Sequence, residues 1–236
     1  EILKELPRDD ARVSFIHQNL RQMREVLRDG HGASLAVFHG KPEEVFQGLA
    51  DQWDIKAVYT NRDYEPYAKT RDEAVKSLLD AAGIPLHTFK DQVIFEKSEV
   101  VKGDGDPYVV YTPYMKKWKE VFSEAGEPEP APSESKLEHL IPEKDLPFPT
   151  LEEIGFTQSA ITVPDYNLEE NLISRYEQTR NIPARDGTSH LGPHLRFGTV
   201  SIRKVLQRAR KAENETFWNE LIWREFFMQI LWHFPH

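Results

Sequence analysis

The sequence contains no cysteine, which excludes a disulfide framework, a thiolate metal site and a cysteine nucleophile. It also lacks an apolar run of the roughly 20 residues that a membrane-spanning helix needs, and no secretory signal is visible. Neither of two common phosphate-binding loops, GxGxxG and the P-loop, is present. We therefore expect a globular, cytoplasmic protein that binds no metal and contacts no membrane.

Charge is distributed unevenly along the chain, whose net charge is −9. Residues 123–170 contain twelve Asp or Glu against two Lys, whereas residues 175–211 contain nine Lys or Arg against two acids. A local basic stripe can bind a phosphate backbone even when the whole protein is acidic. Ordinary solvated helix faces would give the same composition, so composition leaves both interpretations open.

The first part of the chain alternates patterns that are typical of helices and strands. Asp10 precedes a run with helical spacing, Pro42 suits the first turn of a second helix, and Gly83 closes a third. Strands joined by helices imply right-handed crossovers and a parallel sheet. The expected elements are helices over 10–30, 42–53 and 67–82, and strands over 33–38, 55–59 and 84–89.

The composition changes after a short aromatic helix expected over 111–122. Residues 127–149 contain six prolines among many acids, which predicts an extended connection without regular structure. After it the strand patterns stop. Helices are expected over 168–181, 201–211 and 215–234. The fold class is therefore an α/β domain with a parallel sheet, a linker, and an all-helical domain.

A loop that begins at Thr188 reads Thr-Ser-His-Leu-Gly-Pro-His-Leu-Arg-Phe-Gly-Thr-Val-Ser-Ile-Arg. Thr188, Ser189 and Gly192 are small enough for a phosphate to approach their hydroxyl and backbone N–H groups. Arg196 adds fixed positive charge. The alternative is a glycine-punctuated loop before a helix that Thr199 or Ser201 caps.

A second informative stretch lies on the last expected helix. Glu220, Trp223, Arg224 and Phe227 recur at the spacing of one helical face. Such a face suits a pocket that stacks a flat ring and hydrogen-bonds its edge. The alternative is a Glu220–Arg224 surface pair beside an aromatic core stripe.

Three motifs in this order and spacing resemble the DNA photolyase/cryptochrome family, and in particular its class I cyclobutane pyrimidine dimer photolyases. They are Tyr176 with Arg180, the loop from Thr188 to Arg203, and the Glu-Leu-Ile-Trp-Arg-Glu-Phe run that begins at Glu220. Looser similarity at Asn61–Tyr67, Arg71-Asp72 and Tyr111–Trp118 extends the resemblance over nearly the whole chain.

The resemblance implies a Rossmann-like antenna domain over residues 1–122, an acidic, proline-rich linker over 123–165, and the first part of a helical FAD-binding domain over 166–236. The family's opening strand would precede Glu1, and its later flavin motifs would follow His236. The resemblance also implies FAD, a monomer, and a second antenna chromophore, folate or deazaflavin, whose identity the sequence leaves open.

The resemblance also implies roles for individual residues. Those assigned to FAD are Tyr176, Thr188, Ser189, His190, Leu191, Gly192, Phe217 and Arg224. Those assigned to DNA that contains pyrimidine dimers are Arg180, Glu220, Trp223 and Phe227. Glu220 and Trp223 would be catalytic, because Trp223 would stack the flipped-out dimer and Glu220 would hydrogen-bond it.

The implied activity is that of a deoxyribodipyrimidine photo-lyase, in which light-excited reduced FAD donates an electron to the cyclobutane ring. A Glu220 carboxyl group that is protonated in an apolar pocket would stabilise charge on the dimer. The main alternative is a cryptochrome-type photoreceptor that binds flavin without repairing DNA, but Glu at 220 and Trp at 223 favour repair. A nucleotide-binding α/β module with an unrelated helical partner is a third hypothesis.

Overall fold

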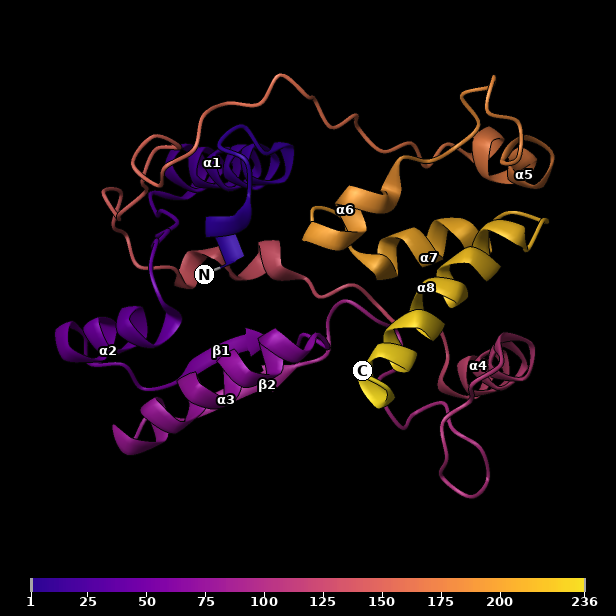
Figure 1. The fold of residues 1–236 in the computed structure, drawn as a ribbon, viewed down its shortest axis with the longest axis horizontal. Helices are drawn as coiled ribbons and strands as arrows, with labels where there is room; N and C mark the ends of the chain where they lie inside the picture. Colours follow the sequence, from indigo (N-terminus) through magenta and orange to yellow (C-terminus); the bar gives the residue numbers. More distant parts are fainter. Residues whose placement is uncertain (1, 236) are drawn as a thin grey trace. The chain divides into compact units, whose positions relative to one another are not determined.

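The structure is a computed structural model that describes residues 2–235 of the 236-residue chain (Figure 1). Those residues are mostly helical and contain a small parallel sheet. The α-helices are α1 (Ala11–His31), α2 (Pro42–Gln52), α3 (Pro66–Ala81), α4 (Tyr111–Ala125), α5 (Glu170–Thr179), α6 (Leu191–Phe197), α7 (Ile202–Arg210) and α8 (Thr216–His233). Two strands, β1 (Val58–Asn61) and β2 (Leu86–Phe89), and two 3-10 helices, η1 (Ile2–Glu5) and η2 (Ser133–His139), complete the described elements.

The chain divides into two compact units. The first unit combines Glu1–Gln52 with Ala131–Asp165, and the second combines Trp53–Pro130 with Tyr166–His236. These units group residues differently from the domains that the sequence predicts, because the segment predicted as linker packs with the N-terminal helices. The predicted domain boundaries remain a prediction, and each unit is described by itself.

The first unit is built around α1. The Asp10 carboxylate accepts a hydrogen bond from the Arg12 backbone N–H (2.8 Å), which caps the start of the helix. Gly32 ends α1 in the left-handed conformation at φ 65°. The predicted linker lies against this helix, since the His17 ring nitrogen is 2.9 Å from the Pro149 carbonyl oxygen.

The strand predicted over 33–38 is wrong, because within the described residues this segment is irregular and pairs with no neighbouring strand. The backbone N–H of Val37 instead donates to the Pro147 carbonyl oxygen (2.7 Å). An apolar run becomes a strand only when a neighbouring strand completes its hydrogen-bond ladder. The predicted linker contains the 3-10 helix η2 and turns over 151–155, and α4 extends into its first residues, 123–125.

The second unit contains the sheet and the remaining helices. Strands β1 and β2 pair in parallel, with Val58 opposite Leu86, and α3 connects them and packs on β2 (Figure 1). Helix α8 packs against α4, α5 and α7. The fully buried side chains of this core include Tyr114 and Trp118 from α4 and Ile222 from α8. The parallel sheet that the sequence predicts is confirmed, but with two strands in the described residues.

No helix among residues 2–235 is both long and apolar enough to cross a membrane.

Candidate functional site

Helices α5 and α8 of the second unit bring together two pairs of predicted site residues. Arg180 Nη1 donates a hydrogen bond to Glu220 Oε1, and the two groups form an ion pair. This bond raises the pKa of Arg180. The guanidinium carbon of Arg180 lies 5.3 Å from the centre of the Tyr176 ring, and Phe217 meets that ring edge-on at 5.0 Å. Residues predicted for FAD and residues predicted for DNA are therefore neighbours.

The surroundings of Glu220 differ from both interpretations of its sequence pattern. Its side chain is 36% exposed and faces the Arg180 guanidinium, so it does not lie in an apolar pocket. Its cationic partner is on another helix, whereas the sequence alternative paired it with Arg224 on the same helix. The ion pair links the end of α5 to the face of α8 that carries Glu220, Trp223 and Phe227.

The aromatic part of that face is formed by Trp223 and Phe227. Trp223 is partly buried, and its ring stacks on Tyr111 with 3.5 Å between the ring centroids. Phe226 meets Trp223 edge-on at 5.7 Å. Phe227 is 61% exposed and lies 5.6 Å from Trp223. The face thus presents one anchored ring and one exposed ring.

Arg224 points away from this face. Its Nη1 donates to the Gln92 carbonyl oxygen (2.7 Å) and its Nη2 to the Leu195 carbonyl oxygen (3.3 Å). Burial lowers the pKa of Arg224. The Arg224 guanidinium thus holds the chain that follows β2 and the helix α6, and the prediction that Arg224 acts together with Glu220, Trp223 and Phe227 stays a prediction. A contact between Arg224 and FAD stays a prediction.

The loop predicted to hold phosphate lies at the end of α5. Thr188 is exposed, whereas Ser189 is buried and its carbonyl oxygen accepts from the Asn167 backbone N–H (2.9 Å). His190 adopts the left-handed conformation at φ 52°, which is uncommon for a non-glycine residue. Its ring nitrogen lies 3.0 Å from Asp186 Oδ1.

The short helix α6 begins inside the motif at Leu191, where the sequence predicted a loop. Leu191 is buried in the core of the second unit, and Gly192 is exposed. Of the predicted FAD residues in this stretch, the structure therefore leaves Thr188 and Gly192 accessible and uses Leu191 for packing.

Gly187 supports this loop and was missed by the sequence interpretation. It is buried against α5, where the Thr179 hydroxyl donates to the Gly187 carbonyl oxygen (3.3 Å). A Cβ atom on Gly187 would lie 2.6 Å from Thr179 Cβ and 2.8 Å from Thr179 Oγ1. Only glycine allows this approach of loop and helix.

We expect Gly187→Ala to lower the free energy of unfolding by about 1–3 kcal/mol, because the new methyl group overlaps Thr179. Urea unfolding of the purified chain measures the effect. Gly192→Ala is the matched control, since its Cβ would meet nothing within 4 Å, and it should change stability by less than about 0.5 kcal/mol. Equal effects of the two changes would refute the role of Gly187.

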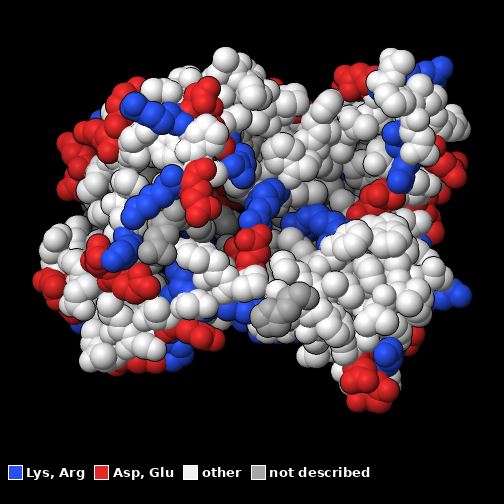
Figure 2. Space-filling model, viewed as in Figure 1, with Lys and Arg blue, Asp and Glu red and all other residues white. Residues whose placement is uncertain are grey.

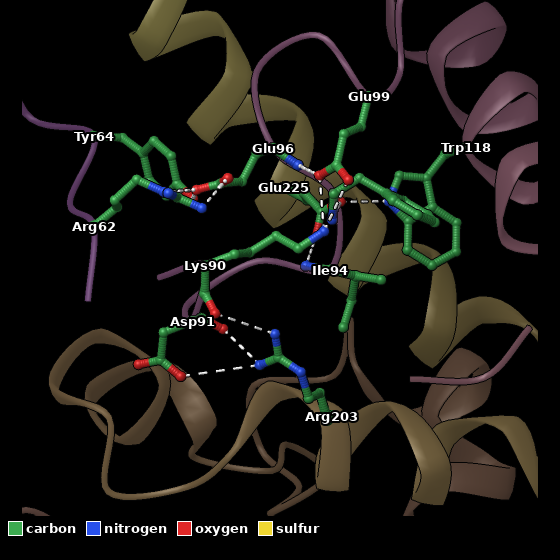
Figure 3. A network of polar contacts seen from close by, with 11 residues as sticks. Arg62, Tyr64, Lys90, Asp91, Ile94, Glu96, Glu99, Trp118, Arg203 and Glu225 are labelled. Carbon is green, nitrogen blue, oxygen red and sulfur yellow. Dashed lines mark hydrogen bonds and ion pairs between the residues drawn. The ribbon is translucent and has the colours of Figure 1, made fainter. Parts of the chain in front are cut away.

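A buried carboxylate on α8, Glu225, was also missed. Its Oε2 accepts from the Ile94 backbone N–H (2.7 Å) and its Oε1 from Trp118 Nε1–H (2.6 Å), two partners that Figure 3 labels. The Oε1 atom also accepts from the Phe95 backbone N–H (2.9 Å). Burial raises the pKa of Glu225 to about 7 although the three donors oppose this. The sequence feature that could have revealed this residue is an acidic residue between Ile222 and Phe226, on the apolar side of the helix.

Helix α7 also holds the segment that follows β2. Arg203 donates to the carbonyl oxygens of Asp91 (2.9 Å) and Lys90 (3.5 Å) (Figure 3). With the bonds from Arg224 and Glu225, side chains of two helices fix the backbone that follows β2. This network ties the sheet to the helices within the second unit.

A cavity of about 360 Å³ lies beside this network. Its wall includes Asn61, the last residue of β1, and Asp91, two residues after β2, together with Arg196 and Arg224 from the helices. In parallel sheets, ligands bind outside the carboxyl ends of the strands. The basic side chains of the wall are Arg62, Arg71, Arg196 and Arg224, against the acids Asp63 and Asp91.

The basic stripe over 175–211 is partly neutralised in the folded chain. Arg180 pairs with Glu220, Arg196 with Glu65, and Arg203 approaches Asp91 at 3.9 Å. Basic and acidic side chains also stand next to each other on the face drawn in Figure 2. The count along the sequence therefore overstates the positive charge that is available to a phosphate backbone. Across residues 2–235 no cluster of His, Asp or Glu has the arrangement of a metal site.

The fold and the site define a class of protein in which a parallel α/β segment packs with helices that carry an Arg–Glu pair and an anchored Trp. A family model described as DNA photolyase matches residues 4–134, which is more than half of the chain. The chain therefore belongs to the DNA photolyase family.

Individual relatives agree with this assignment. A deoxyribodipyrimidine photo-lyase of Halobacterium salinarum is 35% identical over 94% of this chain and 50% of its own length. One from a Synechococcus strain is 32% identical over 100% of this chain and 54% of its own length. The crystal structure of a class III photolyase from Agrobacterium tumefaciens matches 97% of this chain and 51% of its own, with 26% identity and a TM-score of 0.69. The chain thus spans about half the length of these relatives.

Proposed function

We propose that this chain is part of a light-driven, FAD-dependent enzyme that repairs cyclobutane pyrimidine dimers in DNA. The observation that carries the proposal is that Arg180, at the end of α5, pairs with Glu220 on α8, one helical turn before the anchored ring of Trp223. A flat aromatic ring near a carboxylate and a guanidinium matches the needs of a flipped-out pyrimidine dimer next to a phosphate. Two relatives bear the name of this activity.

The residues of the loop fit a flavin dinucleotide. Thr188 offers an exposed hydroxyl, and a Cβ atom on Gly192 would meet nothing within 4 Å, so neither residue is required for packing. Tyr176 and Phe217 would form the adjoining aromatic wall. When bound, the flavin supplies the electron that cleaves the cyclobutane ring.

The side chains of this chain do the remaining work in the proposal. Trp223 stacks the extruded dimer, Glu220 hydrogen-bonds its edge, and Arg180 meets a backbone phosphate. The dimer costs less to extrude than intact bases because it stacks poorly. Phe227 extends the apolar contact, since it is exposed next to Trp223.

The cavity at the strand ends is the place we propose for a second, light-harvesting chromophore. Arg196 and Arg71 would meet acidic or carbonyl groups of such a ligand, and the walls are fixed by the hydrogen bonds of Arg224. We propose a folate or a deazaflavin as this ligand, and a cytoplasmic location for the protein.

We expect Trp223→Ala to weaken binding of dimer-containing DNA by about 5- to 150-fold, because stacking of a base on an aromatic ring contributes roughly 1–3 kcal/mol. Binding in the dark to duplexes with and without one dimer, using the intact flavin-loaded protein, measures the effect. Trp53→Ala is the matched control, since Trp53 is 46% exposed and lies outside the site. It should leave both affinities unchanged.

Illumination completes the test. The flavin-loaded protein should restore intact thymines from the dimer in blue light and not in the dark, as product analysis by chromatography would show. A protein that binds flavin but neither prefers dimer-containing DNA nor repairs it would refute the proposal and support the photoreceptor alternative.

A further inference from the structure

Tyr111 is the residue whose placement the proposed function leaves unexplained. It is the first residue of α4 and belongs to the Tyr111–Trp118 stretch, to which the sequence assigned no role. Its ring lies over the Trp223 ring with 3.5 Å between centroids and 8° between planes. Aromatic pairs ordinarily prefer offset or edge-on arrangements to such a full overlap. The surroundings must therefore hold the two rings in register.

The hydroxyl end of the Tyr111 side chain is fixed by a hydrogen bond. Its hydroxyl donates to the Asn219 carbonyl oxygen (2.9 Å), one helical turn before Trp223. Burial, followed by the nearby Glu220 carboxylate, raises the pKa of Tyr111 to about 12. The hydroxyl therefore keeps its proton, and with it the hydrogen bond, at neutral pH. Tyr111 thus touches the Trp223 ring and lies near Glu220.

The helix that carries Tyr111 cannot shift independently of α8. Tyr114 lies 5.2 Å from Phe226, and Trp118 donates to the buried Glu225 carboxylate. Tyr114 and Trp118 are each only 1% exposed. Because α4 is anchored at these points along its length, the position of the Tyr111 ring is defined by the core.

A third ring fixes the angle of the stack. Phe226 meets Trp223 edge-on at 5.7 Å and Tyr111 edge-on at 5.9 Å. Such an edge restricts rotation of both stacked rings. Trp223 would otherwise be a partly buried side chain with freedom to change its tilt on α8.

We propose that Tyr111 is a positioning residue that backs one face of Trp223 and sets its tilt, so that the indole meets the extruded dimer in one orientation. This inference rests on the proposed function. It adds a contribution from α4 to a face that the sequence attributes to α8 alone. Tyr111 itself does not touch the DNA in this proposal.

The test compares Tyr111→Leu, which removes the flat backing, with Tyr111→Phe, which keeps the ring and loses the hydroxyl. Dark binding of duplexes with and without one dimer is measured with the intact flavin-loaded protein. Tyr111→Leu should weaken binding of the dimer about two- to tenfold and leave undamaged DNA unchanged. Tyr111→Phe should restore binding to within about twofold of the unchanged protein.

Tyr108→Leu is the matched control, because Tyr108 packs on the same core but contacts Tyr114 instead of Trp223. It should leave dimer binding unchanged. If Tyr111→Leu lowers the melting midpoint, Tyr111→Met replaces it, since the unbranched, flexible methionine side chain can follow the shape left by tyrosine without a flat ring. An unchanged or tighter affinity of Tyr111→Leu for the dimer would overturn the inference, as would an equal loss for both DNAs.

Trp223→Ala separates this inference from the proposed function. If Trp223→Ala weakens dimer binding and Tyr111→Leu does not, only the positioning role fails. If Trp223→Ala has no effect, the proposed function itself fails.

Discussion

Replacing Glu225 with alanine is expected to lower the free energy of unfolding of the chain by at least about 3 kcal/mol. The change leaves the backbone N–H groups of Ile94 and Phe95 and the Nε1–H group of Trp118 without their acceptor in a buried region. Each unsatisfied buried donor costs roughly 1–3 kcal/mol. Urea unfolding followed by circular dichroism measures the loss.

Glu213→Ala is the matched control for this prediction. Glu213 is exposed just before α8, and its replacement should change stability by less than about 0.5 kcal/mol. A loss for Glu225→Ala that is no larger than the loss for Glu213→Ala would contradict the role of Glu225 as the acceptor that joins α8 to the chain after β2.

The stability of the chain is expected to fall as the pH rises from 5 to 8, through the titration of the same residue. Burial raises the pKa of Glu225 to about 7 from the ordinary value of 4.5. The folded chain therefore binds the proton more tightly than the unfolded chain does. The stability that proton binding at Glu225 contributes is fully present below pH 4.5 and is lost as the pH rises through 7. About 2–3 kcal/mol of this stability is lost between pH 5 and 8.

Glu225→Gln isolates this contribution, because glutamine has nearly the same shape and does not titrate. The difference in unfolding free energy between the unchanged chain and Glu225→Gln should decrease by that amount between pH 5 and 8. Other titrating groups near the residue, such as Tyr64 and Arg224, cancel in the difference. A difference that is constant with pH would show that the carboxylate stays charged throughout, held by its three donors.

The positions of most helices could be predicted because the helix pattern is local. Helix α7 (Ile202–Arg210) lies within one residue at each end of the range predicted from apolar spacing, and α8 (Thr216–His233) does so as well. Backbone bonds within a helix join residues four positions apart, so a window of the sequence contains most of the information. The strand over 33–38 was predicted wrongly because a strand depends on a partner from elsewhere in the chain.

The sequence by itself determined the membership of the chain in its family, through three motifs of small, aromatic and charged residues, and placed Glu220, Trp223 and Phe227 along one side of a helix. Only the tertiary structure decided the partner of each side chain. It pairs Glu220 with Arg180 across 40 positions, and joins Glu225 to the Ile94 backbone across 131 positions. It also places Tyr111 on Trp223. The physical reason is that hydrogen bonds and ring contacts of side chains depend on distance in space, which the spacing of residues along one helix does not specify.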